Sequence, residues 1–190
     1  MKVADLYQKY NLMPQLITHQ LRVGSIVRLI TDDRDSILTA LVHDMGNLAK
    51  FSNLDEYWTN EQLIFWDKYG KDANIATLNI LEEAGLTKLH SYIDQEAYLY
   101  QNIIKIDDLS KISKPAVLTL YGDSRVAFDG VVSLEERIID LETRYQNYHN
   151  DRMWIPKLEK YVQSLTSRDI AAITEKDVEP LFDELLTYTL

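Results

Sequence analysis

Residues 14–48 read PQLITHQLRVGSIVRLITDDRDSILTALVHDMGNL, and this stretch is the most informative about the fold. Pro14 suits the first turn of a helix, where its missing N–H is not needed. Beyond it, apolar residues recur at mixed three- and four-residue steps, which is the period of an amphipathic helix. The acidic segment 31–35 interrupts that period, and a second apolar helical pattern follows at 37–48, with Gly46 close to its end. The stretch therefore predicts two helices joined by a short acidic turn.

The rest of the chain repeats the helical period with short breaks. Helices are expected at about 60–68, 72–85, 87–104, 114–126, 133–148, 154–165 and 179–190. Residues 133–136 have the spacing of a capping box, Gly85 fits a helix C-cap, and Pro180 fits a first turn. The β-branched pair at 131–132 is too short to indicate a sheet, so we predict an all-α fold.

Length and composition fit one globular domain. The chain has 190 residues, of which 46% are apolar, enough for a core and too many for wholesale disorder. We expect residues 1–150 to form a helical domain and residues 151–190 to form C-terminal helices packed on the same domain.

The charge balance narrows the classes of partner. Thirty acidic residues against 20 basic ones give a formal net charge of −10. Neutralising nucleic-acid phosphates requires a basic surface, so nucleic acid is not expected as a partner. A small phosphorylated ligand would also be repelled on average, unless something local reverses the sign of the charge.

The absence of cysteine excludes disulfides, thiolate nucleophiles and cysteine-based zinc sites. No uninterrupted apolar run approaches the roughly 20 residues of a membrane helix. The start of the chain, MKVADLYQKYNLMPQL, lacks the basic-then-apolar pattern of a secretory signal. We therefore expect a cytoplasmic protein with no membrane partner.

Polar side chains interrupt the apolar helical patterns at three places. His19 lies within the first pattern, His43 and Asp44 follow the second, and Asp123 interrupts the pattern after Pro115. Each residue alone has an ordinary interpretation, since a histidine on an apolar helix is more often a satisfied core residue than a ligand. Adjacent helical positions diverge by about 100°, so His43 and Asp44 can hold one ion together only at a helix end or a distorted turn. A carboxylate such as Asp123 on an apolar face requires a cation.

The order His19, His43-Asp44, Asp123 resembles the signature of the HD-domain superfamily of metal-dependent phosphohydrolases. The surrounding segments THQLRV at 18–23, LVHDMGN at 41–47 and GDSRV at 122–126 are also similar to the family's motifs. The resemblance covers residues 19–126.

The resemblance implies an HD-domain-like helical bundle with one divalent metal held by His19, His43, Asp44 and Asp123. Two imidazoles and two carboxylates suit Mn, Fe, Co, Ni, Zn or Mg without selecting among them. The implied reaction is hydrolysis of a phosphate ester by a metal-activated water, with a small molecule, expected to be a nucleotide, as substrate. The resemblance does not decide between a monoester and a diester. It also leaves the oligomeric state open, and a homodimer is one of the alternatives.

Three further residues are candidates for contacts with that substrate. Arg22 suits bidentate phosphate binding, although a salt bridge to a carboxylate such as Asp123 explains it equally well. Lys50 is a second phosphate candidate, with a solvated side chain as the alternative. Asp72 could line the site as an acid or a phosphate contact, or serve as a helix N-cap.

The sequence also departs from the family. Asn47 stands where the family commonly has lysine, and where its bacterial 5′-deoxynucleotidase branch has a catalytic glutamate. Asparagine can orient a water but cannot act as a general base. His90 is the single histidine between His43 and Asp123, and its expected surface or capping role argues against a binuclear centre. The alternative function is therefore a non-catalytic module of HD type that senses nucleotides or binds a partner.

Aromatic residues gather in two regions. Tyr57, Trp58, Phe65, Trp66 and Tyr69 form one group, and Tyr145, Tyr148, His149 and Trp154 form the other. The first group is interpreted as core, with stacking on a nucleobase as the alternative, and the second as packing between terminal helices.

Overall fold

The computed structural model describes residues 1–50, 60–144 and 154–190, apart from the side chains at 50, 60–62 and 104. Helices make up most of this part of the chain, and the one sheet within it has two short strands. The predicted all-α class is therefore confirmed.

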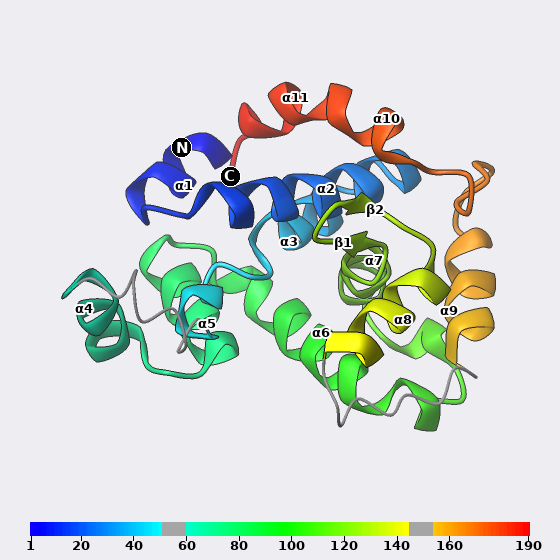
Figure 1. Cartoon of the computed structure of the whole chain (residues 1–190), viewed down its shortest axis with the longest axis horizontal. Coiled ribbons are helices and arrows are strands. Elements are labelled where there is room, and N and C mark those ends of the chain that lie inside the picture. Colours follow the sequence, from blue (N-terminus) through cyan, green and yellow to red (C-terminus); the bar gives the residue numbers. More distant parts are fainter. Residues whose placement is uncertain (51–59, 145–153) are drawn as a thin grey trace.

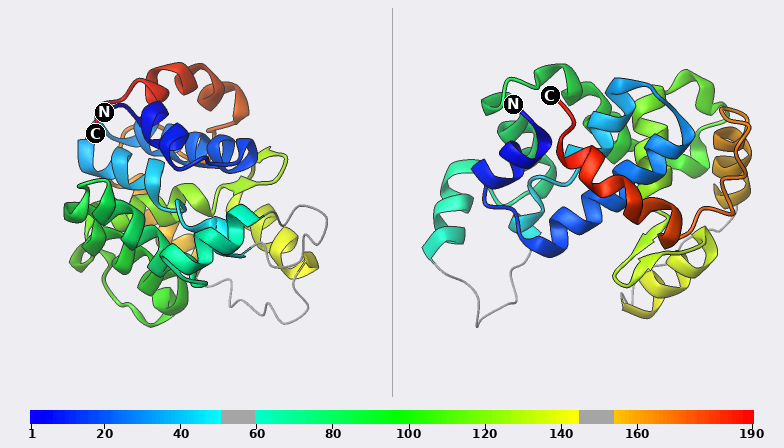
Figure 2. Two further views of the ribbon diagram at one scale, coloured as in Figure 1. Left: turned by 90° about the vertical axis from the view of Figure 1, so that its left-hand side faces the viewer. Right: turned by 90° about the horizontal axis from the view of Figure 1, so that it is seen from above.

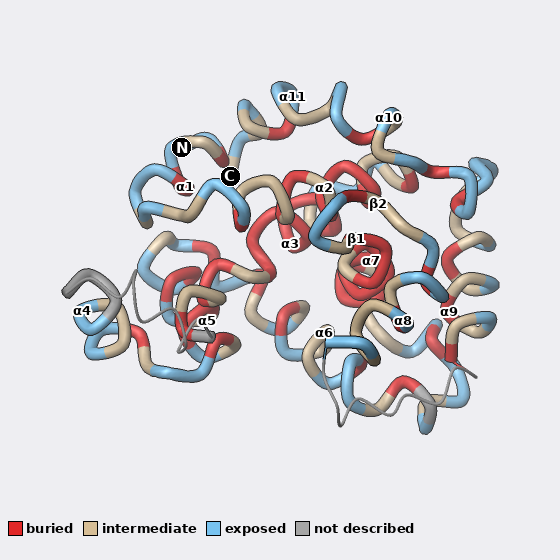
Figure 3. Tube along the Cα trace, in the orientation of Figure 1, coloured by how far each residue is buried: buried red, intermediate tan, exposed pale blue. Residues whose placement is uncertain are grey.

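Three helices form the centre of the molecule: α2 (Pro14–Ile30), α3 (Arg34–Val42) and α7 (Lys114–Asp123). They pack against one another, and α7 is seen almost end-on in the middle of the ribbon (Figure 1). Pro14 occupies the first turn of α2, and the Asp33 carboxylate caps α3 by accepting the Ser36 N–H at 2.9 Å. Every residue from 115 to 122 is buried, so α7 is the core helix around which the others are arranged (Figure 3).

The other elements surround this centre. They are α1 (Val3–Lys9), η1 (Asn47–Lys50), α4 (Asn60–Tyr69), α5 (Ala73–Glu83), η2 (Thr87–Leu89), α6 (His90–Asn102), η3 (Ile103–Lys105), η4 (Leu109–Lys111), β1 (Val126–Ala127), β2 (Gly130–Val131), α8 (Leu134–Arg144), α9 (Trp154–Gln163), α10 (Glu175–Val178), η5 (Glu179–Leu181) and α11 (Phe182–Leu186), where η denotes a 3₁₀ turn. Helices α6 and α9 pack on α7, α5 packs on η1, and α10 and α11 lie against α2, as the two rotated views show (Figure 2).

Two local signals in the sequence have the predicted effect. Gly85, at φ +76°, follows the end of α5, and the next N–H, of Leu86, returns to the Leu81 carbonyl at 2.8 Å. Ser133 and Glu136 form a reciprocal capping box at the start of α8, with bonds of 2.8 and 3.1 Å. The helix predicted to reach residue 148 is described as far as Arg144, and the positions beyond it lie outside the described residues.

The helix predicted to include Val126 ends earlier, at Asp123, and Val126 opens strand β1. The β-branched pair at 131–132 is too short to indicate a sheet, but β1 pairs antiparallel with β2, with Val126 opposite Val131. Gly130 has a φ of +144°, which glycine adopts readily and other residues do not, so it lets the chain reverse within a short hairpin. The prediction failed because two-residue strands carry no periodicity.

The single helix predicted for 179–190 is also wrong. The chain forms α10, η5 and α11 instead, starting at a capping box between Thr174 and Asp177. Pro180 lies in the first turn of η5, where its ring removes one N–H and separates the helical pieces. The last residues are extended and pair with the N-terminus, with the Val3 N–H donating to the Tyr188 carbonyl at 3.0 Å.

No described helix combines the length and the apolarity that crossing a membrane requires.

Candidate metal centre

Four side chains that are distant in the sequence converge where α2, α3 and α7 meet. His19 lies on α2, His43 is the C-cap of α3, Asp44 follows it in a turn, and Asp123 is the last residue of α7. Each offers one ligand atom, and these four atoms lie within 4.8 Å of one another. The cluster can therefore hold a metal ion.

The distances between the ligand atoms suit a small divalent cation. His19 Nε2 lies 3.1 Å from Asp123 Oδ1 and 3.7 Å from Asp44 Oδ2. His43 Nε2 lies 3.7 Å from the same Asp123 atom and 3.8 Å from the same Asp44 atom. Cations bound at about 2.0–2.2 Å place adjacent ligands about 3 Å apart and opposite ligands about 4 Å apart. All four measured separations fall within that interval.

Both histidine Nε2 atoms are buried and have no hydrogen-bond partner in the described part of the chain. A buried polar nitrogen without a partner is costly, so its retention requires an explanation such as an ion. The Nδ1 atom of His43 lies 2.8 Å from the Ala40 carbonyl, to which it can donate. That bond leaves the Nε2 lone pair directed at the cluster, which is the usual outer-shell support of a metal-binding histidine.

Opposite charges are strongly coupled within the cluster. Burial alone would lower the pKa of His43, but the carboxylates of Asp44 and Asp123 outweigh it and raise the pKa to about 9. Burial alone would raise the pKa of Asp123, yet the neighbouring imidazoles of His19 and His43 hold it well below its usual range. The cluster therefore attracts positive charge, whether as protons or as a metal ion.

A tight turn after α3 positions Asp44. The Asn47 side-chain amide donates to Asp44 Oδ2, and the Asn47 side-chain oxygen is buried without a described partner. Gly46 packs so closely on α5 that an added Cβ would lie 2.2 Å from the Ala73 carbonyl oxygen, and its N–H donates to Thr77 Oγ1 at 2.8 Å. The distorted turn that two adjacent ligands require is thus present at the end of α3.

Arg22 and Asp72 are both engaged in structural contacts. The Nε of Arg22 donates to Glu175 Oε1 at 2.7 Å and its Nη1 donates to the Phe128 carbonyl at 3.4 Å, so the carboxylate that it pairs with is not Asp123. Asp72 caps α5 by accepting the Ile75 N–H at 2.9 Å. Neither residue is among the four that converge in the cluster, and the Lys50 side chain lies outside the described residues.

Of the other histidines and aromatic residues singled out in the sequence, His90, Phe65 and Tyr69 are described and are not among the four converging residues. His90 is the first residue of α6, half-buried and not part of the cluster. Phe65 and Tyr69 contact each other on α4, with ring centroids 5.0 Å apart. Tyr57 and Trp58, and likewise residues 145–149, lie outside the described residues.

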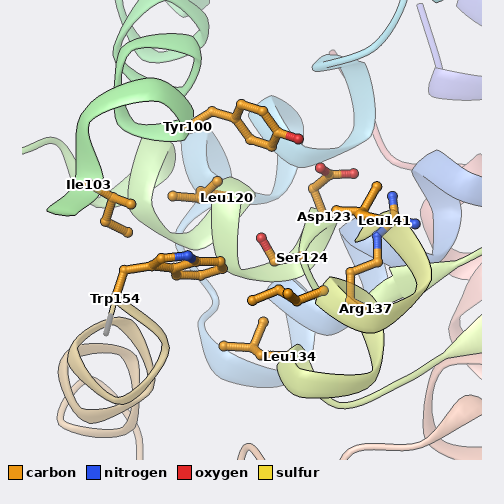
Figure 4. A pocket seen from close by; sticks show the side chains of 10 residues that line it. Tyr100, Ile103, Leu120, Asp123, Ser124, Leu134, Arg137, Leu141 and Trp154 are labelled. Atoms are coloured by element: carbon orange, nitrogen blue, oxygen red, sulfur yellow. The ribbon is translucent and has the colours of Figure 1, made fainter. Parts of the chain in front are cut away.

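A pocket beside the cluster was not predicted from the sequence. It lies between α6, α7, α8 and α9 and is lined by Tyr100, Ile103, Leu120, Asp123, Ser124, Leu134, Arg137, Ile138, Leu141 and Trp154 (Figure 4). Asp123 belongs both to this pocket and to the cluster. Trp154 is buried, as its interpretation as packing implies, but it also forms one wall of the pocket. No local signal indicates Arg137 or Tyr100, because each lies on an ordinary amphipathic helix.

Comparisons with known proteins returned no match for this chain, whether against protein-family models, curated proteins or solved structures.

Proposed function

We propose that this protein is a metal-dependent phosphohydrolase of the HD-domain type, acting on a small phosphate ester such as a nucleotide. The observation that carries the proposal is the convergence of two unpartnered histidine nitrogens and two carboxylates at one point. This set of ligands, and their order along the chain, is the one that the resemblance to HD-domain proteins implies.

The set suits Mn, Fe, Co, Ni, Zn or Mg, because imidazole and carboxylate ligands are borderline to hard. The chemistry that such an ion supplies is the activation of water and the polarisation of a phosphoryl oxygen. His19, His43, Asp44 and Asp123 would hold it, and the Ala40 carbonyl would keep His43 in the required tautomer. The Asn47 side-chain oxygen, which has no described partner, is placed next to Asp44 and can accept a hydrogen bond from the attacking water.

One observation favours a second candidate, a nucleotide-sensing or partner-binding module without catalysis. Asn47 donates its amide to Asp44 and offers no basic group, so it cannot remove a proton from water. In this alternative the metal and the ligand bind, and the ester is not cleaved.

The test is to load the purified full-length chain with Mn²⁺ and to compare it with Asp44→Asn. We expect about one metal ion per wild-type chain by elemental analysis, together with phosphate release from at least one member of a panel of nucleotides, sugar phosphates and aryl phosphates. The Asp44→Asn variant should lose both the bound metal and the release of phosphate, because the substitution removes one of the two anionic ligands. Asp94→Asn, an exposed carboxylate on α6, is the matched control and should retain both.

A chain that holds no metal after loading with Mn²⁺, Ni²⁺ or Zn²⁺ would rule out the phosphohydrolase. Stoichiometric metal and nucleotide binding without turnover across the panel would support the sensor instead.

A further inference from the structure

The pocket beside the cluster has a polar end and an apolar end. In Figure 4 the Asp123 carboxylate and the Arg137 guanidinium lie on one side, and the Tyr100 hydroxyl is directed towards them. Trp154 and Ile103 lie on the opposite side, with Leu120 between the two ends. Since Asp123 is also one of the four cluster residues, the polar end adjoins the candidate metal centre.

Arg137 is the one cationic side chain among the described residues that line the pocket. Its Nη1 donates to Asp140 Oδ2 at 2.7 Å, which fixes the guanidinium against α8. A guanidinium carries five N–H donors, so this contact leaves donors that can bind a phosphate in the pocket. The side chain is only 17% exposed, which strengthens its attraction for an anion relative to a solvated arginine.

Arg22 is less suited to this task than Arg137. Its guanidinium is already paired with Glu175, and it does not line the pocket. A phosphate at Arg22 would have to compete with that carboxylate.

The apolar end limits what else the ligand can carry. Most side chains there are aliphatic, and the Trp154 indole and the Ser124 hydroxyl are the polar groups beside them, so this end selects mainly by shape and burial (Figure 4). The volume of the whole pocket is about 40 Å³, room for about three water molecules, so only a small group such as a branched alkyl group or the edge of a single ring can be buried in it. Tyr100 at the polar end is 51% exposed, so larger parts of a ligand would extend towards solvent.

We propose that this pocket is the substrate site, in which Arg137 binds the phosphate and the Trp154 end receives a small apolar or aromatic group of the same ester. The proposal rests on the proposed function and, among small phosphate esters, favours those of small apolar or aromatic alcohols over nucleotides.

The test compares two ligands that cannot be hydrolysed, methylphosphonate and phenylphosphonate, by calorimetric titration of the Mn²⁺-loaded chain. We expect phenylphosphonate to bind the wild type at least tenfold more tightly than methylphosphonate, because only the phenyl group reaches the apolar end. Trp154→Ala should remove most of that preference and leave methylphosphonate binding unchanged. Trp66→Ala, which removes an indole from α4, is the matched control and should retain the preference.

Arg137→Gln should weaken the binding of both phosphonates at least tenfold, and Arg137→Lys should restore part of the lost affinity. Arg144→Gln is its matched control: Arg144 pairs with the same Asp140 carboxylate but does not line the pocket, so binding should change less than twofold. Retention of Mn²⁺ by each variant, with an unchanged far-UV circular dichroism spectrum, shows that fold and metal site are intact.

Equal affinities for the two phosphonates, or equal losses in Arg137→Gln and Arg144→Gln, would overturn the pocket assignment while metal binding and hydrolysis stand. Tighter binding of adenosine monophosphate than of phenylphosphonate would overturn the assignment of a small group. If Mn²⁺ is not retained, the proposed function fails. The pocket is then decided by titrating the metal-free chain at higher phosphonate concentrations and measuring the effect of Trp154→Ala on the preference.

Discussion

His43 uses its two ring nitrogens for different tasks at the buried end of α3. Nδ1 faces the Ala40 carbonyl, and Nε2 faces Asp44 and Asp123 without a hydrogen-bond partner. The pKa of about 9 means that the metal-free ring carries a proton at neutral pH. A metal ion can bind Nε2 only after that proton has left.

We therefore expect metal affinity to depend on pH. Between about pH 7 and pH 9, the Mn²⁺ association constant should rise about tenfold per unit, because one proton is released for each ion bound. Calorimetric titrations in two buffers of different ionisation enthalpy measure that proton directly. An affinity that does not change over this range would contradict the protonated state of His43.

The same pKa shift affects stability in the metal-free protein. Because the folded-state pKa lies above the ordinary value of 6.5, the stabilisation is fully present below pH 6.5 and is lost as the pH rises through about 9. The thermal unfolding temperature of the metal-free chain should fall over that interval. Saturating Mn²⁺ should reduce the fall, since the ion replaces the proton.

At the scale of elements, the turn after α3 is held against α5. Gly46 approaches α5 without room for a Cβ, and its buried N–H donates to Thr77 Oγ1. The Thr77 hydroxyl donates in turn to the Ala73 carbonyl at 2.9 Å. Packing between two elements thus sets the position of the nearby candidate ligand Asp44.

Thr77→Val is expected to destabilise the protein by about 1–3 kcal/mol, because it leaves the Gly46 N–H buried without a partner. It should also lower Mn²⁺ affinity, since the turn that carries Asp44 loses its anchor. Thr77→Ser keeps the hydroxyl and loses one methyl group, so it should cost about 1 kcal/mol and leave metal affinity close to the wild type. Urea unfolding measures the stability and Mn²⁺ titration measures the metal affinity. Equal stabilities and equal affinities of Thr77→Val and Thr77→Ser would show that the hydrogen bond from the Gly46 N–H to Thr77 is unimportant.

A second connection between elements involves Arg125, just after α7. Its buried guanidinium donates to the Ile170 carbonyl at 2.7 Å, the Ile173 carbonyl at 2.9 Å and the Tyr121 hydroxyl at 2.6 Å. These contacts join the end of the core helix to the segment that leads into α10. The arginine of the GDSRV segment therefore has a structural role beside the candidate ligand Asp123.

For the whole molecule, the net charge of −10 disfavours anionic ligands, and in the proposed function a divalent cation in the cluster would reverse this locally. Two carboxylates and one divalent cation sum to about zero. Arg137, in the pocket that Asp123 also lines, then makes the site attractive to phosphate. Without the ion, the two carboxylates outweigh the single positive charge of protonated His43, and the remaining negative charge would repel phosphate.

Removal of the metal with a chelator should therefore weaken methylphosphonate binding at least tenfold at low ionic strength. It should also destabilise the fold relative to the metal-loaded protein. At a metal concentration 100 times the dissociation constant, binding contributes about 2.7 kcal/mol, which for a chain of this size raises the unfolding temperature by about 5–10 °C. Calorimetry of both forms measures these effects, and equal phosphonate affinity with and without metal would contradict the charge argument.

Much of the fold could be predicted from local patterns. The helical period, Pro14, Gly85 and the capping box at Ser133 are local signals, and each has in the structure the role that the sequence predicts for it. The hairpin at 126–131 and the broken C-terminal helix were missed because short strands lack a period and Pro180 is compatible with both a helix start and a break.

The sequence by itself determined the all-α class, because helical periodicity is a property of the residues and their spacing, and it indicated the four side chains that converge through their resemblance to the HD-domain motifs. Only the tertiary structure decided that Arg22 pairs with Glu175, 153 positions away, and that Arg137 and Trp154 line a pocket shared with Asp123. Such contacts arise where distant helices pack, and no pattern within one helix records which neighbour it will meet.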